Sequence, residues 1–273
     1  MASLFLYLYT SMLKGLIKVL VVLYLLASIG LYFAQNKIIF YGHPYPEDKK
    51  YPGVKELEIA IDDGLTMNAA LVQAKPQSRS KGAILYLHGN KGNVRRGIYQ
   101  SRSMQNRGYD LLIPDYRGYG KTEGQPINDT QLLTDANKAY QYLKDNYEED
   151  KIYVVGYSLG SGMASYVAKE NNPAGLILVA PFTSLEDIKN QFLWMFPDFL
   201  LKYKLSNEEH LNEVKAPVTI LHGTADNVVK YKYGAELKTM YPETNLITFK
   251  GESHRGIIFR LSEVLNQKIP YLN

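Results

Sequence analysis

A serine lies between two glycines in the segment Gly156-Tyr157-Ser158-Leu159-Gly160, which has the form Gly-x-Ser-x-Gly. This pattern is typical of a strained turn from a strand into a helix, with the serine hydroxyl exposed at its tip. Glycines suit such a turn because a Cβ at either position would press against the neighbouring strand or helix. The apolar run Lys151–Val155 and the small residues after Gly160 predict that strand and helix. We predict that Ser158 is a nucleophile; the alternative is a glycine-rich turn without chemistry.

A nucleophilic serine needs a base, because its hydroxyl is unreactive at neutral pH. With this motif the acid and then the histidine follow the serine along the chain. Of the histidines that follow Ser158, His254 lies in a short loop after the last predicted strand and is predicted to be the general base. His222 ends an apolar strand and is interpreted as a partly buried structural residue. His210 lies in a charged stretch and is interpreted as solvated.

The acid that orients the base should follow the strand that precedes it. Asp226 has this position, four residues beyond His222 at the end of the apolar run Val218–Leu221. Glu236 and Glu243 fall within or after the next predicted helix, so they are weaker candidates. We predict that Asp226 orients His254, the alternative role being an N-cap of that helix.

Acyl transfer also needs backbone N–H groups directed at the developing oxyanion. One is predicted to come from Leu159, the residue directly after the nucleophile. The second is predicted to be the N–H of Asn90, in the glycine-containing turn that follows the apolar run Ala83–Leu87. His88 precedes a glycine in the same turn and is interpreted as a structural hydrogen-bonding residue. This chemistry needs no metal ion and no organic cofactor.

Strand-like and helix-like segments alternate along most of the chain. Apolar runs of strand length occur at Ala83–Leu87, Asp110–Pro114, Ile152–Val155, Gly175–Val179, Val218–Leu221 and Leu246–Phe249. Segments of helical period occur at Val94–Arg107, Thr130–Tyr147, Ser161–Asn171 and Ile257–Gln267. This alternation predicts an α/β fold with a mostly parallel sheet covered by helices on both faces. Ahead of it, Val54–Ile61 and Leu65–Ala74 flank Asp62-Asp63-Gly64 and predict a hairpin.

One interval, about residues 185–214, breaks the alternation and is dense in aromatic side chains. It is interpreted as an inserted helical cap over the serine. Phe192, Trp194 and Phe196 are predicted to contact an apolar acyl chain of a small-molecule or lipid-like substrate. The alternative is that they form only the packing core of the cap.

The first 34 residues form a separate, strongly apolar segment. The run Val19–Ala34 has no charged side chain, and with the preceding turn it approaches the roughly 20 residues that a spanning helix needs. We predict a single-pass membrane anchor at residues 1–34, a connector at 35–53 and a catalytic domain at 54–273. A cleaved signal peptide ending at Ala34 is the alternative, although Tyr32 is bulky for a cleavage site. Lysines lie on both sides of the segment, so charge predicts no orientation.

The composition excludes several classes of protein. The chain has no cysteine, so disulfides, thiolate metal sites and cysteine nucleophiles are absent. Its net charge of +4 over 273 residues is spread out without a basic run, which argues against nucleic acid as a partner. The sequence has no feature that specifies an oligomeric state.

Several motifs together resemble the α/β-hydrolase superfamily in the order of its landmarks: His88-Gly89-Asn90, Asp115–Gly120, Gly156–Gly160, Pro181–Ser184 and Gly223–Asp226. The short cap, the apolar N-terminus and Gln35–Phe40 make the chain most similar to the Bem46 and ABHD12/13/17 branch. The resemblance runs from about Gln35 to the C-terminus. It implies a membrane-associated serine hydrolase acting on acyl esters or thioesters, with a structural role for Asp115. A serine peptidase of the same fold and a non-catalytic binding or scaffold protein are the alternatives.

Overall fold

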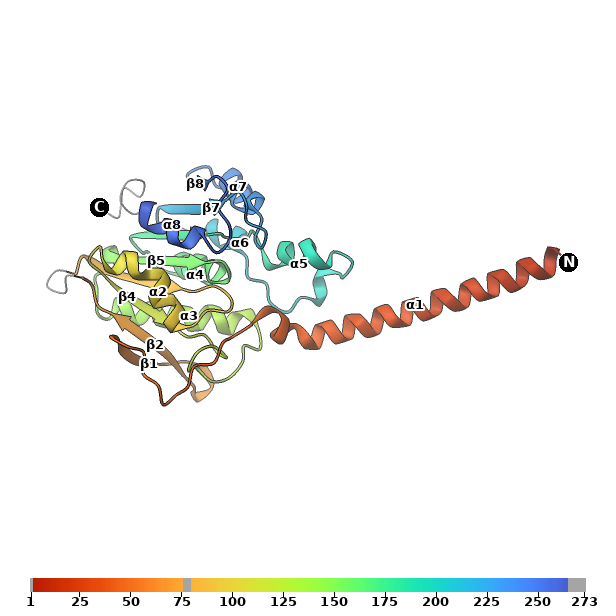
Figure 1. The fold of residues 1–273 in the computed structure, drawn as a ribbon, viewed down its shortest axis with the longest axis horizontal. Helices are drawn as coiled ribbons and strands as arrows, with labels where there is room; N and C mark the ends of the chain where they lie inside the picture. The colour runs from red at the N-terminus through yellow and green to blue at the C-terminus, as the bar shows by residue number, and fades with distance from the viewer. Residues whose placement is uncertain (1, 76–79, 265–273) are drawn as a thin grey trace.

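An eight-stranded sheet forms the centre of the structure, a computed structural model that describes residues 2–75 and 80–264 (Figure 1). The strands are β1 (Lys55–Ala60), β2 (Thr66–Val72), β3 (Gly82–Leu87), β4 (Tyr109–Pro114), β5 (Ile152–Tyr157), β6 (Gly175–Val179), β7 (Val218–Gly223) and β8 (Asn245–Phe249). Their spatial order is β1-β2-β4-β3-β5-β6-β7-β8. β2 is antiparallel to both neighbours and all other pairs are parallel, so the predicted hairpin and mostly parallel sheet are confirmed.

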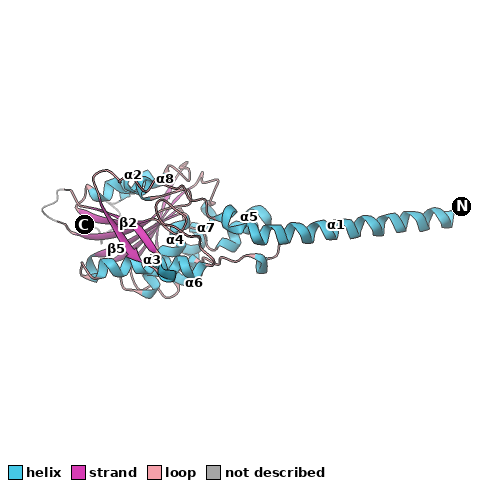
Figure 2. Ribbon diagram, turned by 90° about the horizontal axis from the view of Figure 1, so that it is seen from below, coloured by secondary structure: helices cyan, strands magenta, loops and turns pink. Residues whose placement is uncertain are grey.

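Helices cover both faces of the sheet (Figure 2). The covering helices are α2 (Val94–Gln105), α3 (Asp129–Lys144), α4 (Leu159–Glu170), α6 (Asn207–Leu211), α7 (Tyr231–Met240) and α8 (Ile257–Val264). One apolar core lies under α2 and α8, and the other under α3, α4 and α7. Every residue of β3, β5 and β6 is buried, because these strands have a helical layer on each side. The end of the predicted helix Ile257–Gln267 and of the predicted domain lies outside the described residues.

The N-terminal helix α1 (Ala2–Ile39) is a single element that extends away from the domain (Figure 1). Its 38 residues give a length of about 57 Å at 1.5 Å per residue. Among the described residues it is the one helix long and apolar enough to cross a membrane. The helix continues beyond the predicted boundary at residue 34 because its last turn is bonded to the domain. Gln35 Nε2 donates to the Leu200 carbonyl at 2.6 Å, and Asn36 Nδ2 donates to the Pro126 carbonyl at 2.8 Å.

The inserted cap is shorter than predicted. It consists of α5 (Leu185–Leu193) and the 3-10 turn η3 (Asp198–Leu200), which lie beside the near end of α1 (Figure 1). From Tyr203 onward the chain is back in the core: Tyr203 and Leu205 are fully buried, and α6 packs against α4. The predicted end near residue 214 is therefore too late, because α6 covers the sheet rather than the serine.

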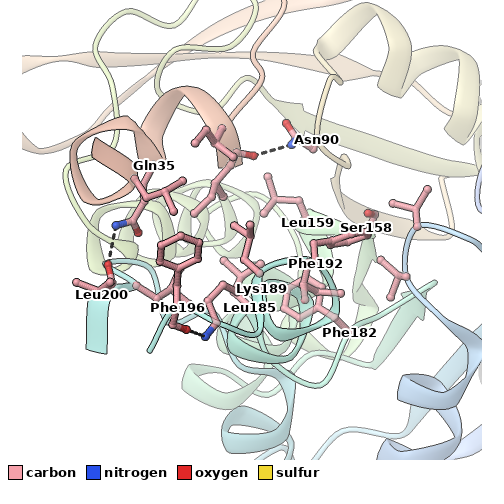
Figure 3. A pocket seen from close by; sticks show the side chains of 18 of the residues that line it. Gln35, Asn90, Ser158, Leu159, Phe182, Leu185, Lys189, Phe192, Phe196 and Leu200 are labelled. Atoms are coloured by element: carbon pink, nitrogen blue, oxygen red, sulfur yellow. Dashed lines mark hydrogen bonds between the residues drawn. The ribbon is translucent and has the colours of Figure 1, made fainter. Parts of the chain in front are cut away.

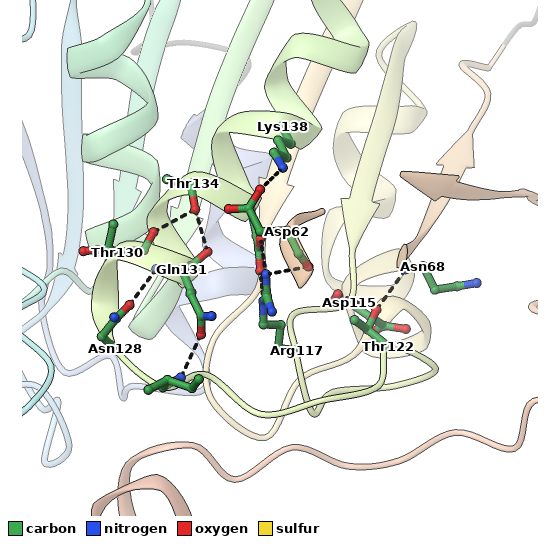
Figure 4. Close-up of polar contacts among 12 residues, drawn as sticks. Asp62, Asn68, Asp115, Arg117, Thr122, Asn128, Thr130, Gln131, Thr134 and Lys138 are labelled. Atoms are coloured by element: carbon green, nitrogen blue, oxygen red, sulfur yellow. Dashed lines mark hydrogen bonds and ion pairs between the residues drawn. The ribbon is translucent and has the colours of Figure 1, made fainter. Parts of the chain in front are cut away.

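Buried polar contacts fix the turn after β4, at the carboxyl end of the parallel strands, where Ser158 also lies. Asp115 accepts hydrogen bonds from the Val94 N–H at 2.7 Å and the Tyr51 hydroxyl at 2.8 Å, and burial raises its pKa to about 6. Arg117 Nε donates to Asp135 at 2.6 Å within a fully buried ion pair (Figure 4). Removing one partner of such a pair typically costs about 3–5 kcal/mol, because the other charge stays buried. These contacts give Asp115 a structural role.

Candidate active site

Ser158 occupies the turn between β5 and α4 in a strained backbone conformation, with φ +52° and ψ −115°. The two flanking glycines make the turn possible. A Cβ on Gly156 would lie 2.5 Å from the Ala164 Cβ, and one on Gly160 would lie 2.1 Å from the Leu87 carbonyl oxygen. The turn therefore holds the serine where β5 meets α4, at the carboxyl end of the central strand.

A continuous chain of hydrogen bonds links the predicted nucleophile, base and acid. His254 Nε2 lies 3.0 Å from Ser158 Oγ, and His254 Nδ1 lies 2.7 Å from Asp226 Oδ2. Asp226 follows β7 and His254 follows β8, so neighbouring strands deliver the two residues to the same end of the sheet. The Asp226 side chain is fully buried, whereas that of His254 keeps an exposed fraction of 11%.

The environment of Asp226 sets the tautomer of His254. Burial alone would raise the pKa of Asp226, but hydrogen bonds from His222 and His254 hold it below its usual value. The Val228 and Val229 N–H groups also donate to Asp226 Oδ1, at 2.9 and 2.8 Å. The carboxylate is therefore ionised and accepts a hydrogen bond from Nδ1–H of His254. This leaves Nε2 unprotonated and able to accept the serine proton.

Two residues outside the predicted set also hold this arrangement. The Tyr157 hydroxyl donates to the His254 carbonyl at 2.8 Å and its ring stacks on the imidazole, so a variable position of the serine motif supports the base. His222 is fully buried, and its Nε2 lies 2.9 Å from the Val229 carbonyl and 3.6 Å from Asp226 Oδ2. The glycine spacing identifies position 157 as part of the serine motif. It does not predict that the Tyr157 side chain contacts a loop 97 residues away.

The prediction that His210 is solvated is wrong. His210 is buried on α6, with Nδ1 2.9 Å from Ser165 Oγ and its ring against Tyr166. Burial lowers its pKa to about 4. Its charged neighbours occupy the outer side of the short helix, while the imidazole faces α4. His88 is likewise fully buried, stacked on Tyr116.

The predicted oxyanion donors, Asn90 and Leu159, have backbone N–H groups without a described partner. Among the residues that the structure describes, no acceptor is bonded to the backbone N–H of Asn90 or of Leu159. The turn that carries Asn90 is strained at Lys91, where φ is +60°. Both Asn90 and Leu159 line the same cavity as Ser158.

The cavity has a volume of about 500 Å³ and mostly apolar walls (Figure 3). Ser158 and Leu159 are among its lining residues. The cap contributes Phe192 and Phe196, two of the three aromatic residues predicted to contact substrate. Trp194 does not line the cavity: it ends α5 and is 77% exposed. The prediction for Trp194 is wrong because the turn after α5 directs its side chain outward.

Solved structures share this architecture. An esterase from Butyrivibrio proteoclasticus, Est1E with ferulic acid bound, superposes with a TM-score of 0.64 at 21% identity, over 76% of this chain and 95% of the esterase. The Pyrococcus furiosus esterase Pf2001 gives 0.63 at 20% identity, over 84% and 97% of the two chains. The chain has the α/β-hydrolase fold. The family model described as serine aminopeptidase, S33, matches residues 78–209 of the chain.

Curated relatives of this chain include lipases. The lysophosphatidylserine lipase ABHD12 of Danio rerio is 32% identical over 180 residues, which cover 58% of this chain and 47% of the lipase. An uncharacterised protein of Mycobacterium tuberculosis is 28% identical over 71% of each chain. The chain thus spans about half the length of the ABHD12 lipases that it matches, and the resemblance predicted from its motifs is confirmed.

Proposed function

We propose that this chain is a membrane-anchored serine hydrolase that cleaves acyl esters or thioesters of lipid-like substrates. The observation that carries the proposal is the 3.0 Å contact between Ser158 Oγ and His254 Nε2, because Ser158 also lines an apolar cavity. A non-catalytic member of the superfamily would need no such hydrogen-bonded chain. Turnover of an acyl-chain series of esters and thioesters by the purified protein tests the proposal.

The mechanism is acyl transfer in two stages. His254 takes the proton of Ser158 as Oγ attacks the substrate carbonyl, and the buried Asp226 stabilises the resulting imidazolium. The N–H groups of Asn90 and Leu159 donate to the tetrahedral oxyanion. His254 then protonates the leaving alcohol or thiol. In the second stage His254 activates a water molecule, which releases the acyl group from Ser158.

The character of the cavity favours an acyl chain over a peptide amine. The cavity residues in the described part of the chain include no carboxylate that could bind an amino terminus. Their one charged side chain, Lys189, is bonded to Asp198 and to the Phe196 carbonyl. The ABHD12 relatives are named as lipases, whereas the matching family model is named for an aminopeptidase. The lining therefore supports the ester or thioester substrate.

Alanine substitutions in the cap should distinguish the role of Phe192 from that of Trp194. We expect Phe192→Ala to lower kcat/KM for long-chain esters by roughly 10–200-fold relative to acetyl esters, the range for a lost apolar contact. Trp194→Ala is the matched control and should leave the ratio unchanged, since Trp194 lies outside the cavity. The measurement is kcat/KM across a chain-length series. Equal effects of the two substitutions would contradict the assignment of the cavity to the acyl chain.

We propose that α1 is a single-pass anchor. Its side chains are exposed and apolar over most of its length, and the charge-free run between Lys18 and Lys37 provides a span of about 27 Å at 1.5 Å per residue. That length approaches the roughly 30 Å hydrocarbon thickness of a bilayer. The exposed aromatic side chains of the cap beside α1 fit the same apolar surroundings.

Fractionation tests the anchor. We expect the full chain to stay in the membrane pellet after an alkaline carbonate wash, with an intact mass that still includes residues 1–34. A variant with Val22→Lys and Leu26→Lys should shift to the supernatant, because each lysine at a helix centre costs about 2.5–3.5 kcal/mol of insertion free energy. Recovery of the unmodified chain in the supernatant, or loss of its first 34 residues, would contradict the anchor.

A further inference from the structure

One wall of the cavity above Ser158 is the anchor helix itself. The last third of α1 contributes Leu31, Gln35 and Ile38, facing Phe192 and Phe196 of the cap (Figure 3). We propose that α1 is part of the acyl-binding site, so that the acyl chain enters between α1 and the cap and lies against the helix during catalysis. This inference rests on the proposed function and names the element that selects chain length.

Directional contacts hold α1 against the cap. The Tyr24 hydroxyl donates to the Met195 carbonyl at 2.9 Å, and the Tyr24 ring stacks on Phe196 with centroids 5.5 Å apart. Three turns further along, Gln35 donates to the Leu200 carbonyl and accepts from the Lys202 N–H at 2.8 Å. A helix that served only as a flexible tether would need none of these bonds. They fix the width of the space in which the acyl chain would lie.

The end of α1 is also bonded to the residue that carries a proposed oxyanion donor. Asn90 Nδ2 donates to the Ile39 carbonyl at 2.6 Å, and Asn90 Oδ1 accepts from the Tyr41 N–H at 2.8 Å. The Tyr119 hydroxyl donates to the same oxygen at 2.9 Å. The helix that would contact the acyl chain is thus bonded to the turn that would hold the carbonyl oxygen. The end of α1 and the Asn90 turn would therefore position the hydrocarbon chain and the carbonyl group of the same acyl group.

An apolar route leads along α1 toward Ser158. A second cavity of about 240 Å³ lies between α1 and η3, and it shares Tyr32 and Leu200 with the first. Phe199, which lines this second cavity, is 79% exposed. An acyl chain can pass along such a route without entering water, which keeps its apolar surface buried throughout. The occupant that this lining fits is the hydrocarbon chain of a lipid.

The test compares two positions on α1 in the full-length chain. Leu31 lines the cavity, whereas Leu26 lies on the same helix and lines neither cavity. The measurement is the rate at which Ser158 reacts with a hexadecyl and with an ethyl fluorophosphonate in detergent micelles. We expect Leu31→Trp to lower the hexadecyl-to-ethyl ratio by about tenfold or more, the lower end of the range for apolar pockets. Leu26→Trp should keep the ratio within about twofold of the unmodified chain.

Each outcome separates the inference from the proposed function. Equal ratios for Leu31→Trp and Leu26→Trp, with normal ethyl-probe labelling, would overturn the role of α1 and leave the hydrolase intact. If Leu31→Trp also loses ethyl-probe labelling, the ratio cannot be measured for it, and Leu31→Ala is used as the test variant instead. That variant leaves the cavity open and should still lower the ratio, so an unchanged ratio there overturns the inference. Failure of both probes to label the unmodified chain would overturn the proposed function itself.

Discussion

Ser158→Ala is expected to abolish labelling by fluorophosphonate and to lower kcat for ester hydrolysis by roughly 10⁶, the scale seen when a serine hydrolase loses its nucleophile. The reason is that Ser158 combines the strained turn with an Oγ 3.0 Å from the proposed base. His254→Ala should lower kcat by nearly as much. The double variant should be no worse than either single one, because the two residues act as a unit. Labelling and steady-state hydrolysis are the measurements.

A second serine–histidine pair provides the matched control. Ser165 Oγ lies 2.9 Å from His210 Nδ1, a contact as short as that at the candidate site, but the pair is buried and outside the cavity. We expect Ser165→Ala to label and to turn over ester like the unmodified protein, per mole of folded chain. If Ser158→Ala still labelled, or if Ser165→Ala did not, Ser158 would not be the nucleophile.

Asp226→Asn has the second largest expected effect, a loss of roughly 10⁴ in kcat, which is the scale measured for this change in a serine protease. The asparagine oxygen can still accept from the Val228 and Val229 N–H groups, so its NH₂ group would face His254. A donor at that place favours the tautomer with the proton on Nε2. That nitrogen then cannot accept the Ser158 proton. Steady-state kcat is the measurement, with the melting temperature as the check on folding.

The control for the acid is a histidine outside the network. His43 is exposed, and no described contact joins its imidazole to Ser158, His254 or Asp226, so His43→Ala should leave kcat unchanged. His222 would be a poor control because it contacts Asp226 at 3.6 Å. Retention of most activity in Asp226→Asn, alongside its loss in His254→Ala, would keep the serine and histidine and require another acid.

The sheet could be predicted because its central strands are buried on both faces. Such strands appear as continuous apolar runs, and the run Gly175–Val179 coincides with β6 residue for residue. The order of the landmarks then brings three strand ends together, which is how Ser158, Asp226 and His254 come to adjacent positions. Local pattern was sufficient here because each residue follows its own strand directly.

The contacts of the cap could not be predicted from local pattern. Aromatic residues are frequent throughout 192–199, but only the path of the turn decides that Phe192 faces the cavity and Trp194 faces outward. Similarly, the charged neighbours of His210 favoured a solvent-exposed imidazole, although the ring packs on α4. The contact between Tyr24 and the cap joins positions 171 residues apart, and no periodicity encodes it.

The exposed position of Trp194 has a practical consequence. It is the only tryptophan in the chain, so its emission reports on the tip of the cap and on nothing else. The indole stands beside the Tyr24–Met195 contact, where cap and anchor meet. Emission wavelength and quenching by brominated lipids would therefore record whether the cap enters a bilayer, in the unmodified protein and without an attached dye.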